Sequence, residues 1–202
     1  ADRQFEFMQL DMEASFATQE DILNFVSEAI RDSTEVITGF RPGEIPHMTW
    51  SDAMERYGSD KPDTRFGMEL ADLTEIFVGT EANVFKVDCV KGILYKGGSD
   101  VLARNAIDAL TEKCQSWGAK GLAWFRVGDG ASLEGALTKF MSDQEIEGIC
   151  SNLAADKGDM ILMVAGKNKN TLEILGNLRS RLGRDLQLYD QNELQFCFIT
   201  DF

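Results

Sequence analysis

The chain has 202 residues and carries 34 acidic against 20 basic side chains, which gives a net charge of -14. Its hydrophobic fraction of 44% and charged fraction of 27% are typical of a globular protein and exclude wholesale disorder. The acidic balance opposes strong nonspecific binding to nucleic acid, because such binding depends on Lys and Arg displacing counterions from phosphates. Any contact with RNA should therefore be local, or should be made by a part of the protein outside this sequence.

Membrane and metal-binding classes find no support in the composition. No apolar run approaches the roughly 20 residues that a membrane helix requires, and the N-terminus lacks the apolar core of a signal peptide. We therefore expect no membrane partner and, by default, a cytoplasmic location. The four cysteines are widely spaced and form no ligand pattern with the single histidine, His47. This predicts reduced structural cysteines and no metal site.

The first predicted element is a strand over residues 3–16. Phe5, Phe7, Gln9, Asp11 and Glu13 share one parity, and Met8, Leu10 and Met12 share the other. A period of two places each set on its own face of a strand. Asp11 and Glu13 also have the ordinary interpretation of solvated surface acids, and Glu13 is the one of the two that we expect to be merely structural.

A helix should follow the strand. Thr18 and Asp21 have the spacing of a capping box, which satisfies free N–H groups at a helix start. All three prolines then lie within residues 39–66, a stretch rich in turn signals. Between these turns we expect a short helix from Trp50 to Tyr57, with Thr49 or Ser51 as its cap. We place a domain boundary near residues 66–82.

Strands alternate with helices in the remainder of the chain. The expected strands are 83–90, 121–127, 159–165 and 194–200, and the expected helices are 102–116, 143–153 and 170–186. This alternation predicts an α+β or α/β fold, with a sheet covered by helices. The glycines of the turn at residues 118–121 do not have the spacing of a phosphate loop.

Several blocks of the sequence resemble one enzyme family. The pattern Arg3-x-x-x-Phe7-x-x-x-Asp11 resembles the second strand of motif 2 in class II aminoacyl-tRNA synthetases. The wider stretch of residues 2–13 is similar to the bacterial and mitochondrial aspartyl-tRNA synthetases at nearly every position. Three further blocks resemble the same family in the same order: Tyr57 to Arg65, Gly118 to Trp124 with Lys139-Phe140, and Ile199 to Phe202.

The resemblance implies a division into parts. Residues 1–66 would be part of the class II catalytic domain and its antiparallel sheet, from the second half of motif 2 onward. Residues 67–198 would be the insertion domain of the family, called the GAD domain. Residues 199–202 would return to the catalytic domain. The chain is thus identified as an internal piece of a bacterial-type aspartyl-tRNA synthetase.

Binding residues are implied by the resemblance at matching positions only. Gln4 aligns with a residue that contacts ATP, and Phe7 with the aromatic ring that stacks on adenine. Gln9 and Asp11 align with residues that line the aspartyl-adenylate pocket, where Asp11 would hold the substrate ammonium. A flat ring suits a base, and a carboxylate pairs with an ammonium through charge-assisted hydrogen bonds. No catalytic residue and no metal ligand is assigned.

The resemblance also implies partners. The complete enzyme would bind ATP with Mg²⁺, L-aspartate and tRNA, would form a homodimer, and would bind neither DNA nor a membrane. The first strand of motif 2, motifs 1 and 3 and the anticodon-binding domain lie outside this sequence, so we expect the isolated chain to be inactive and to hold no cofactor. The alternative is a stand-alone insertion-domain module that contacts tRNA or has a structural role.

One basic window has two interpretations. Lys167, Lys169, Arg179, Arg181 and Arg184 lie close together with Glu173 as the one acid among them before Arg184. They form either an RNA-facing patch or, as we prefer, the solvated face of a helix opposite a leucine stripe.

Overall fold

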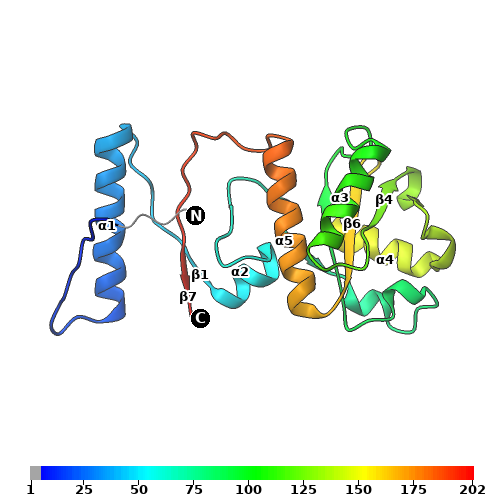
Figure 1. Cartoon of the computed structure of the whole chain (residues 1–202), viewed down its shortest axis with the longest axis horizontal. Helices are drawn as coiled ribbons and strands as arrows, with labels where there is room; N and C mark the ends of the chain where they lie inside the picture. Colours follow the sequence, from blue (N-terminus) through cyan, green and yellow to red (C-terminus); the bar gives the residue numbers. More distant parts are fainter. Residues whose placement is uncertain (1–5) are drawn as a thin grey trace. The chain divides into compact units, whose positions relative to one another are not determined.

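The computed structural model describes residues 6–202, which form two compact units that divide between Pro46 and His47. The α-helices are α1 (Gln19–Thr38), α2 (Trp50–Tyr57), α3 (Arg104–Ser116), α4 (Asp143–Leu153) and α5 (Asn168–Asp185) (Figure 1). The strands are β1 (His47–Thr49), β2 (Ala71–Asp72), β3 (Cys89–Tyr95), β4 (Ala123–Val127), β5 (Leu133–Glu134), β6 (Met160–Gly166) and β7 (Phe198–Thr200). Short 3-10 helices are η1 (Thr74–Phe77), η2 (Asn83–Phe85), η3 (Asp129–Ala131) and η4 (Thr138–Phe140).

The first unit contains helix α1, which begins where the sequence predicts. Thr18 is its N-cap, and the reciprocal hydrogen bonds of the Thr18–Asp21 capping box are both present. Gly39 ends the helix in the left-handed conformation, with φ of 75° and its N–H bonded to the carbonyl of Glu35. None of the α1 residues is fully buried.

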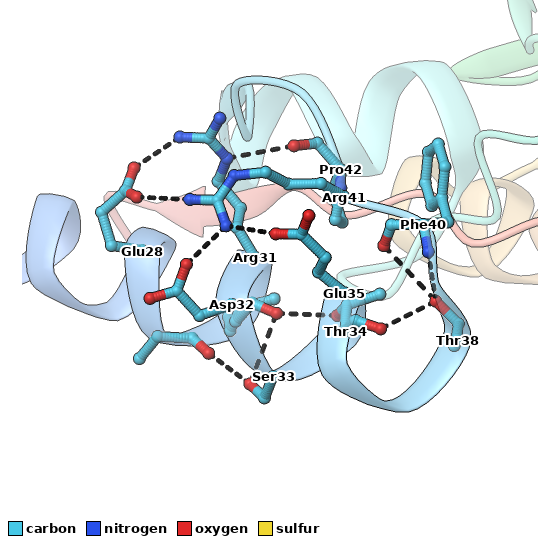
Figure 2. A network of polar contacts seen from close by, with 12 residues as sticks. Glu28, Arg31, Asp32, Ser33, Thr34, Glu35, Thr38, Phe40, Arg41 and Pro42 are labelled. Carbon is cyan, nitrogen blue, oxygen red and sulfur yellow. Dashed lines mark hydrogen bonds and ion pairs between the residues drawn. The ribbon is translucent and has the colours of Figure 1, made fainter.

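Arg41 ties the turn after α1 back onto the helix. Its guanidinium donates to Glu28 at 2.9 Å, to Glu35 at 2.8 Å and to Asp32, and Figure 2 shows these carboxylates converging on it from one side of α1. Arg31 adds a bond from Nε to the carbonyl of Pro42 at 3.0 Å. The hydrogen bonds to Asp32 and then Glu35 hold the pKa of Arg41 above its ordinary value.

The strand expected over residues 3–16 is absent from the described part of that segment, residues 6–16. A strand exists only when its backbone pairs with a neighbour, and residues 6–46 contain no strand that pairs with this segment. Phe16, with φ of 60°, also turns the chain sharply just before α1. Period two alone was therefore an insufficient reason to predict a strand here.

The second unit is built on a five-stranded antiparallel sheet in the order β2-β3-β6-β4-β5. The predicted α+β architecture with helices on a sheet is confirmed. Alternate residues of the central strand β6 face opposite sides: Met160, Leu162 and Val164 pack with α3 and α5. Ile161 and Met163 pack with α4 and the turns around η1 and η2. The two faces of one sheet thus form two hydrophobic cores.

One strand lies later in the chain than predicted. The expected strand 83–90 is wrong over most of its length, because residues 83–85 form η2, where the ring of Phe85 packs 4.2 Å from that of Phe77. The strand begins at Cys89 instead and contains Lys91 and Gly92. Leu73 and Met163 approach Gly92 so closely that a Cβ there would lie 2.9 Å from Leu73 Cδ1.

Strands β1 and β7 form a separate two-stranded sheet. They pair in parallel, with His47 opposite Phe198, Met48 opposite Ile199 and Thr49 opposite Thr200. The rings of His47 and Phe198 lie 5.2 Å apart. Only the last three residues of the strand expected at 194–200 are in β7. The five-stranded sheet therefore lies, in chain order, between two strands that pair with each other.

Helices α2 and α5 touch through two glycines. Gly58 caps α2 with φ of 65°, and a Cβ on it would lie 2.1 Å from the carbonyl oxygen of Leu172. A Cβ on Gly176, in the middle of α5, would lie 2.5 Å from the carbonyl oxygen of Gly58. Both contacts are with backbone atoms, which cannot rotate away.

In residues 6–202 no helix is long and apolar enough to cross a membrane.

Gly176→Ala should destabilise the second unit although alanine favours helices. The added methyl group collides with the backbone of α2, so we expect a loss of about 1–3 kcal/mol in the free energy of unfolding, as for overpacked cores. Thermal unfolding followed by circular dichroism measures the effect. Gly121→Ala is the control, because nothing lies within 4 Å of a Cβ at Gly121. Equal melting temperatures for the two variants would contradict the close contact.

Candidate functional site

The residues predicted to bind adenylate lie in the segment before α1. Gln4 falls outside the described residues. Phe7 is 71% exposed, and Gln9 and Asp11 are also exposed, within a segment that has no helix or strand. Within residues 6–202, neither Gln9 nor Asp11 has a side-chain hydrogen bond to another residue. Their assignment to an aspartyl-adenylate pocket stays a prediction.

The block from Tyr57 to Arg65 lies against α5. It starts at the C-terminus of α2, and Gly58, Ser59 and Asp60 line a cleft of about 550 Å³ between α2 and α5. Trp50 from α2 and polar side chains of α5, among them Asn177, complete its walls. The predicted turn is therefore anchored to the helix pair rather than free in solvent.

Arg179 of α5 holds the chain as it leaves this block. Its side chain is buried, with 1% of its surface exposed. Nη2 donates to the carbonyl oxygens of Phe66 at 2.7 Å and Gly67 at 2.8 Å, and Nε donates to that of Met68 at 3.1 Å. The guanidinium also lies 4.0 Å from the centre of the Phe66 ring and 4.9 Å from that of Tyr57.

Burial dominates the electrostatics around Arg179. It lowers the pKa of the guanidinium from its ordinary value, against the attraction of Tyr57, Asp63 and Glu69. Burial and the charge of Glu69 raise the pKa of Tyr57. The hydrogen bond from Arg56 lowers the pKa of Glu69, and the Arg56–Glu69 pair is 2.8 Å long. Carbonyl oxygens accept the hydrogen bonds of the buried Arg179 guanidinium, and aromatic rings face it, so it needs no carboxylate in direct contact.

Both interpretations of the basic window are wrong for Arg179, because a side chain that is 1% exposed neither meets a phosphate backbone nor belongs to a solvated helix face. Arg181 is partly exposed and pairs with Asp185 of the same helix at 2.9 Å. Arg184 lies beside the same carboxylate, at 3.4 Å. These arginines do not form one exposed basic patch.

A second anchor joins the block to the segment that leads to β7. Arg65 donates to both carboxylate oxygens of Asp63, at 2.9 and 2.8 Å, and stacks 3.9 Å from the centre of the Tyr189 ring. The Thr64 hydroxyl donates to Gln195 at 2.9 Å. The hydrogen bond from Arg65 lowers the pKa of Asp63. Residues 63–65 and 189–195 are thus held side by side.

Lys91 forms a third connection, from β3 to α2. Its side chain is 4% exposed and bonds to Glu55 of α2 and, at 3.1 Å, to Asp72 of β2. Burial works against the ammonium, but the bonds to Glu55 and Asp72 outweigh it, so the pKa of Lys91 lies above its ordinary value. Sequence reasoning missed both Lys91 and Arg179. A lone lysine between apolar residues was the available signal for a buried pair.

The cysteines are free thiols in the structure, as predicted. Cys89, Cys114 and Cys150 are buried, and Cys197 is partly buried. Burial raises the pKa of Cys114 to about 11, which keeps it as an unreactive thiol at neutral pH.

The profile of the GAD domain family matches residues 65–175, and the chain belongs to this family. The whole chain is also similar to bacterial aspartate-tRNA ligases, which confirms the resemblance inferred from its sequence blocks. It is 46% identical to the aspartate-tRNA(Asp/Asn) ligase of Bacillus cytotoxicus and 44% identical to that of Bacillus mycoides. It is 41% identical to the aspartate-tRNA ligase of Shouchella clausii. The chain spans 35% of the length of each of these relatives.

Residues 66–68 form the junction between the block that ends at Arg65 and strand β2. Arg179→Met should unfold this junction, whereas Arg181→Met should not. The first change removes a charged, buried donor from three carbonyls, of which that of Phe66 is at a buried residue, and we expect a loss of about 2–4 kcal/mol. The second removes a partly exposed pair on the same helix and should cost less than about 1 kcal/mol. Urea unfolding of the two variants measures the difference. Similar losses would mean that the buried bonds of Arg179 do not hold the junction.

The Asp63–Arg65 pair should contribute stability only above an acidic threshold. The folded state lowers the pKa of Asp63, so the contribution is present above the unfolded value of about 3.9 and disappears as the pH falls through the folded value. Asp63→Asn should therefore lower the urea midpoint at neutral pH, with the difference shrinking below about pH 4. Asp60→Asn, which loses only an exposed pair with Lys61, is the control. A pH-independent difference for Asp63→Asn would contradict the assignment.

Proposed function

We propose that the chain serves as an internal segment of an aspartate-tRNA ligase. The observation that carries this proposal is similarity at 41–46% identity over the entire chain. The similarity includes residues 1–64, which precede the match to the GAD domain family. A module that used the GAD domain alone would give no reason for that part to be similar, so the stand-alone alternative is not favoured.

In this proposal the complete enzyme activates aspartate and transfers it to tRNA. The aspartate carboxylate attacks the α-phosphate of ATP and pyrophosphate leaves. A terminal ribose hydroxyl of tRNA then attacks the acyl carbon of the mixed anhydride, which forms the ester and releases AMP. This chemistry relies mainly on the positioning of reactants and on stabilisation of charge. Phe7 would stack on adenine, Gln4 would contact ATP, and Gln9 and Asp11 would orient the amino acid.

Mg²⁺ would offset phosphate charge in the complete enzyme. In residues 6–202 no group of three or more His, Cys, Asp or Glu side chains is placed to hold a metal ion. We therefore assign none of these residues as its ligand. A homodimer in the cytoplasm, with no DNA or membrane partner, completes the proposal.

The proposed division of the chain is 1–66 for the catalytic part, 67–198 for the GAD domain and 199–202 for the return. The parallel pairing of β1 with β7 supports an insertion, because the chain leaves the two-stranded sheet after Thr49 and comes back to it at Phe198. The bonds of Arg179 to residues 66–68 support a junction near the proposed boundary.

A chimera tests the proposal. The chain replaces the matching segment of the Bacillus cytotoxicus ligase, and aspartate-dependent exchange of pyrophosphate into ATP is measured. We expect the chimera to be active and the isolated chain to be inactive. An unfolded chimera is recognised by its thermal melt. A folded but inactive chimera, or an active isolated chain, would overturn the corresponding part of the proposal.

Within the chimera, Asp11→Asn should lower kcat/KM for aspartate about 100-fold, or about 2.7 kcal/mol, because the substrate ammonium loses its charged partner. Glu13→Gln removes the same charge two residues away and should change kcat/KM by less than about twofold, since exposed acids contribute little. Steady-state exchange kinetics at varied aspartate concentration separate the two. Equal effects would remove Asp11 from the amino-acid pocket.

A further inference from the structure

A cavity lies at one end of the five-stranded sheet. It shares no lining residue with the cleft between α2 and α5. Strand β6 ends there at Gly166, which pairs with Cys89 at the start of β3. Strand β4 begins nearby, with Ala123 opposite Met163. Because β3 and β4 both run antiparallel to β6, the loops that precede them meet the loop that follows β6. These loops and the first turn of α5 line a cavity of about 370 Å³.

Three lysines line this cavity, one from each loop. Lys86 precedes β3, Lys120 precedes β4, and Lys167 follows β6. All three are exposed at its rim, and none forms an ion pair with an acid in residues 6–202. Asp88 is the one acidic residue in the lining. On a chain with 34 acidic and 20 basic side chains, this local excess of positive charge favours an anion.

The first turn of α5 adds backbone donors. Its N-cap position is Lys167, which provides no side-chain hydrogen bond to the helix, and no acid lies in the first turn. The first N–H groups of a helix lack internal partners and carry the positive end of its dipole. An anion at this position receives hydrogen bonds from the backbone as well as charge from the lysines.

Thr171 gives an independent indication of a ligand. Its side chain is 1% exposed and lines the same cavity. Its Oγ1 lies 3.4 Å from the position of a Cβ on Gly166, another lining residue, so the hydroxyl faces the cavity beside that glycine. No hydrogen bond to this hydroxyl is present among residues 6–202. Its oxygen is not among the fully buried side-chain atoms of residues 6–202 that lack a partner, so the hydroxyl keeps a small contact with the solvent of the cavity. A ligand there would accept its hydrogen bond.

We propose that this cavity binds a phosphate group, with Lys86, Lys120 and Lys167 balancing its charge and Thr171 donating to one of its oxygens. Three lysines and one aspartate leave an excess of two positive charges, which matches a phosphomonoester dianion or a phosphodiester with its neighbours. The site is not a phosphate loop, since the turn at residues 118–121 lacks that spacing. Its groups come instead from three loops that the sheet brings together.

Titration of the folded 202-residue chain with inorganic phosphate, at constant ionic strength, tests the site. We expect saturable changes in the amide NMR signals of residues 166–171 and 120. Lys120→Gln and Lys167→Gln should each weaken binding about fivefold to tenfold, because a charge-assisted contact is lost. Lys139→Gln, the same change in η4 outside this cavity, should leave the affinity unchanged. Shifts that do not saturate, or that ignore the first two variants, would overturn the proposal.

Thr171→Val is a second, nearly isosteric variant. Because the hydroxyl has no protein partner, its removal should weaken phosphate binding without lowering the melting temperature. A lower melting temperature with unchanged binding would show that the hydroxyl serves the fold and not a ligand.

Two probes distinguish the source of the phosphate. A short single-stranded oligoribonucleotide with a 5′-hydroxyl offers only phosphodiesters, whereas inorganic phosphate mimics a small ligand. Displacement of phosphate by the oligoribonucleotide, with loss of that competition in Lys120→Gln, would identify an RNA backbone contact. Saturation by phosphate without such competition would identify a small phosphorylated ligand. If neither probe binds, the proposal fails.

Discussion

The buried guanidinium of Arg179 joins helix α5 to the chain segment that enters the five-stranded sheet. Its bonds to the carbonyls of Phe66, Gly67 and Met68 fix the path of the backbone just before β2. Those carbonyls belong to no helix or strand, and that of Phe66 is at a buried residue, so without Arg179 it would be a buried acceptor lacking a donor. A cation can be buried here because oxygen atoms and the π faces of Phe66 and Tyr57 replace its hydration.

The contact of α2 with α5 depends on the same junction. Gly58 and Gly176 allow the two backbones to approach closely, and Lys91 connects the sheet to α2 through Glu55. Helix α5 is therefore fixed along its middle by α2 and residues 66–68. Its first turn, at the other end of the same rigid element, contributes the backbone donors of the cavity that contains Thr171. One helix thus supports both the junction and the proposed phosphate site.

Helices were the most predictable part of the fold. The bounds expected for α2 and α4 agree with the structure, and those of α3 and α5 differ by at most two residues at either end, because caps and a period of 3.6 are local signals. Strands were harder to predict. β3 begins at Cys89, near the end of the strand expected at 83–90, because Lys91 and Gly92 interrupt its apolar run, and the expected strand at 3–16 lacks a partner among the described residues.

The sequence by itself determined the family, through ordered blocks of similar residues, and it determined where the helices lie. Only the tertiary structure determined which charged side chains are buried and which lie close together. Arg179 and Arg181 are two residues apart on one helix, yet the first is buried and the second partly exposed, because only one faces Tyr57 and Phe66. Lys86, Lys120 and Lys167 are far apart in the chain and meet at one cavity. The register of β3, β6 and β4 brings them together, and long-range pairing leaves no local mark in a sequence.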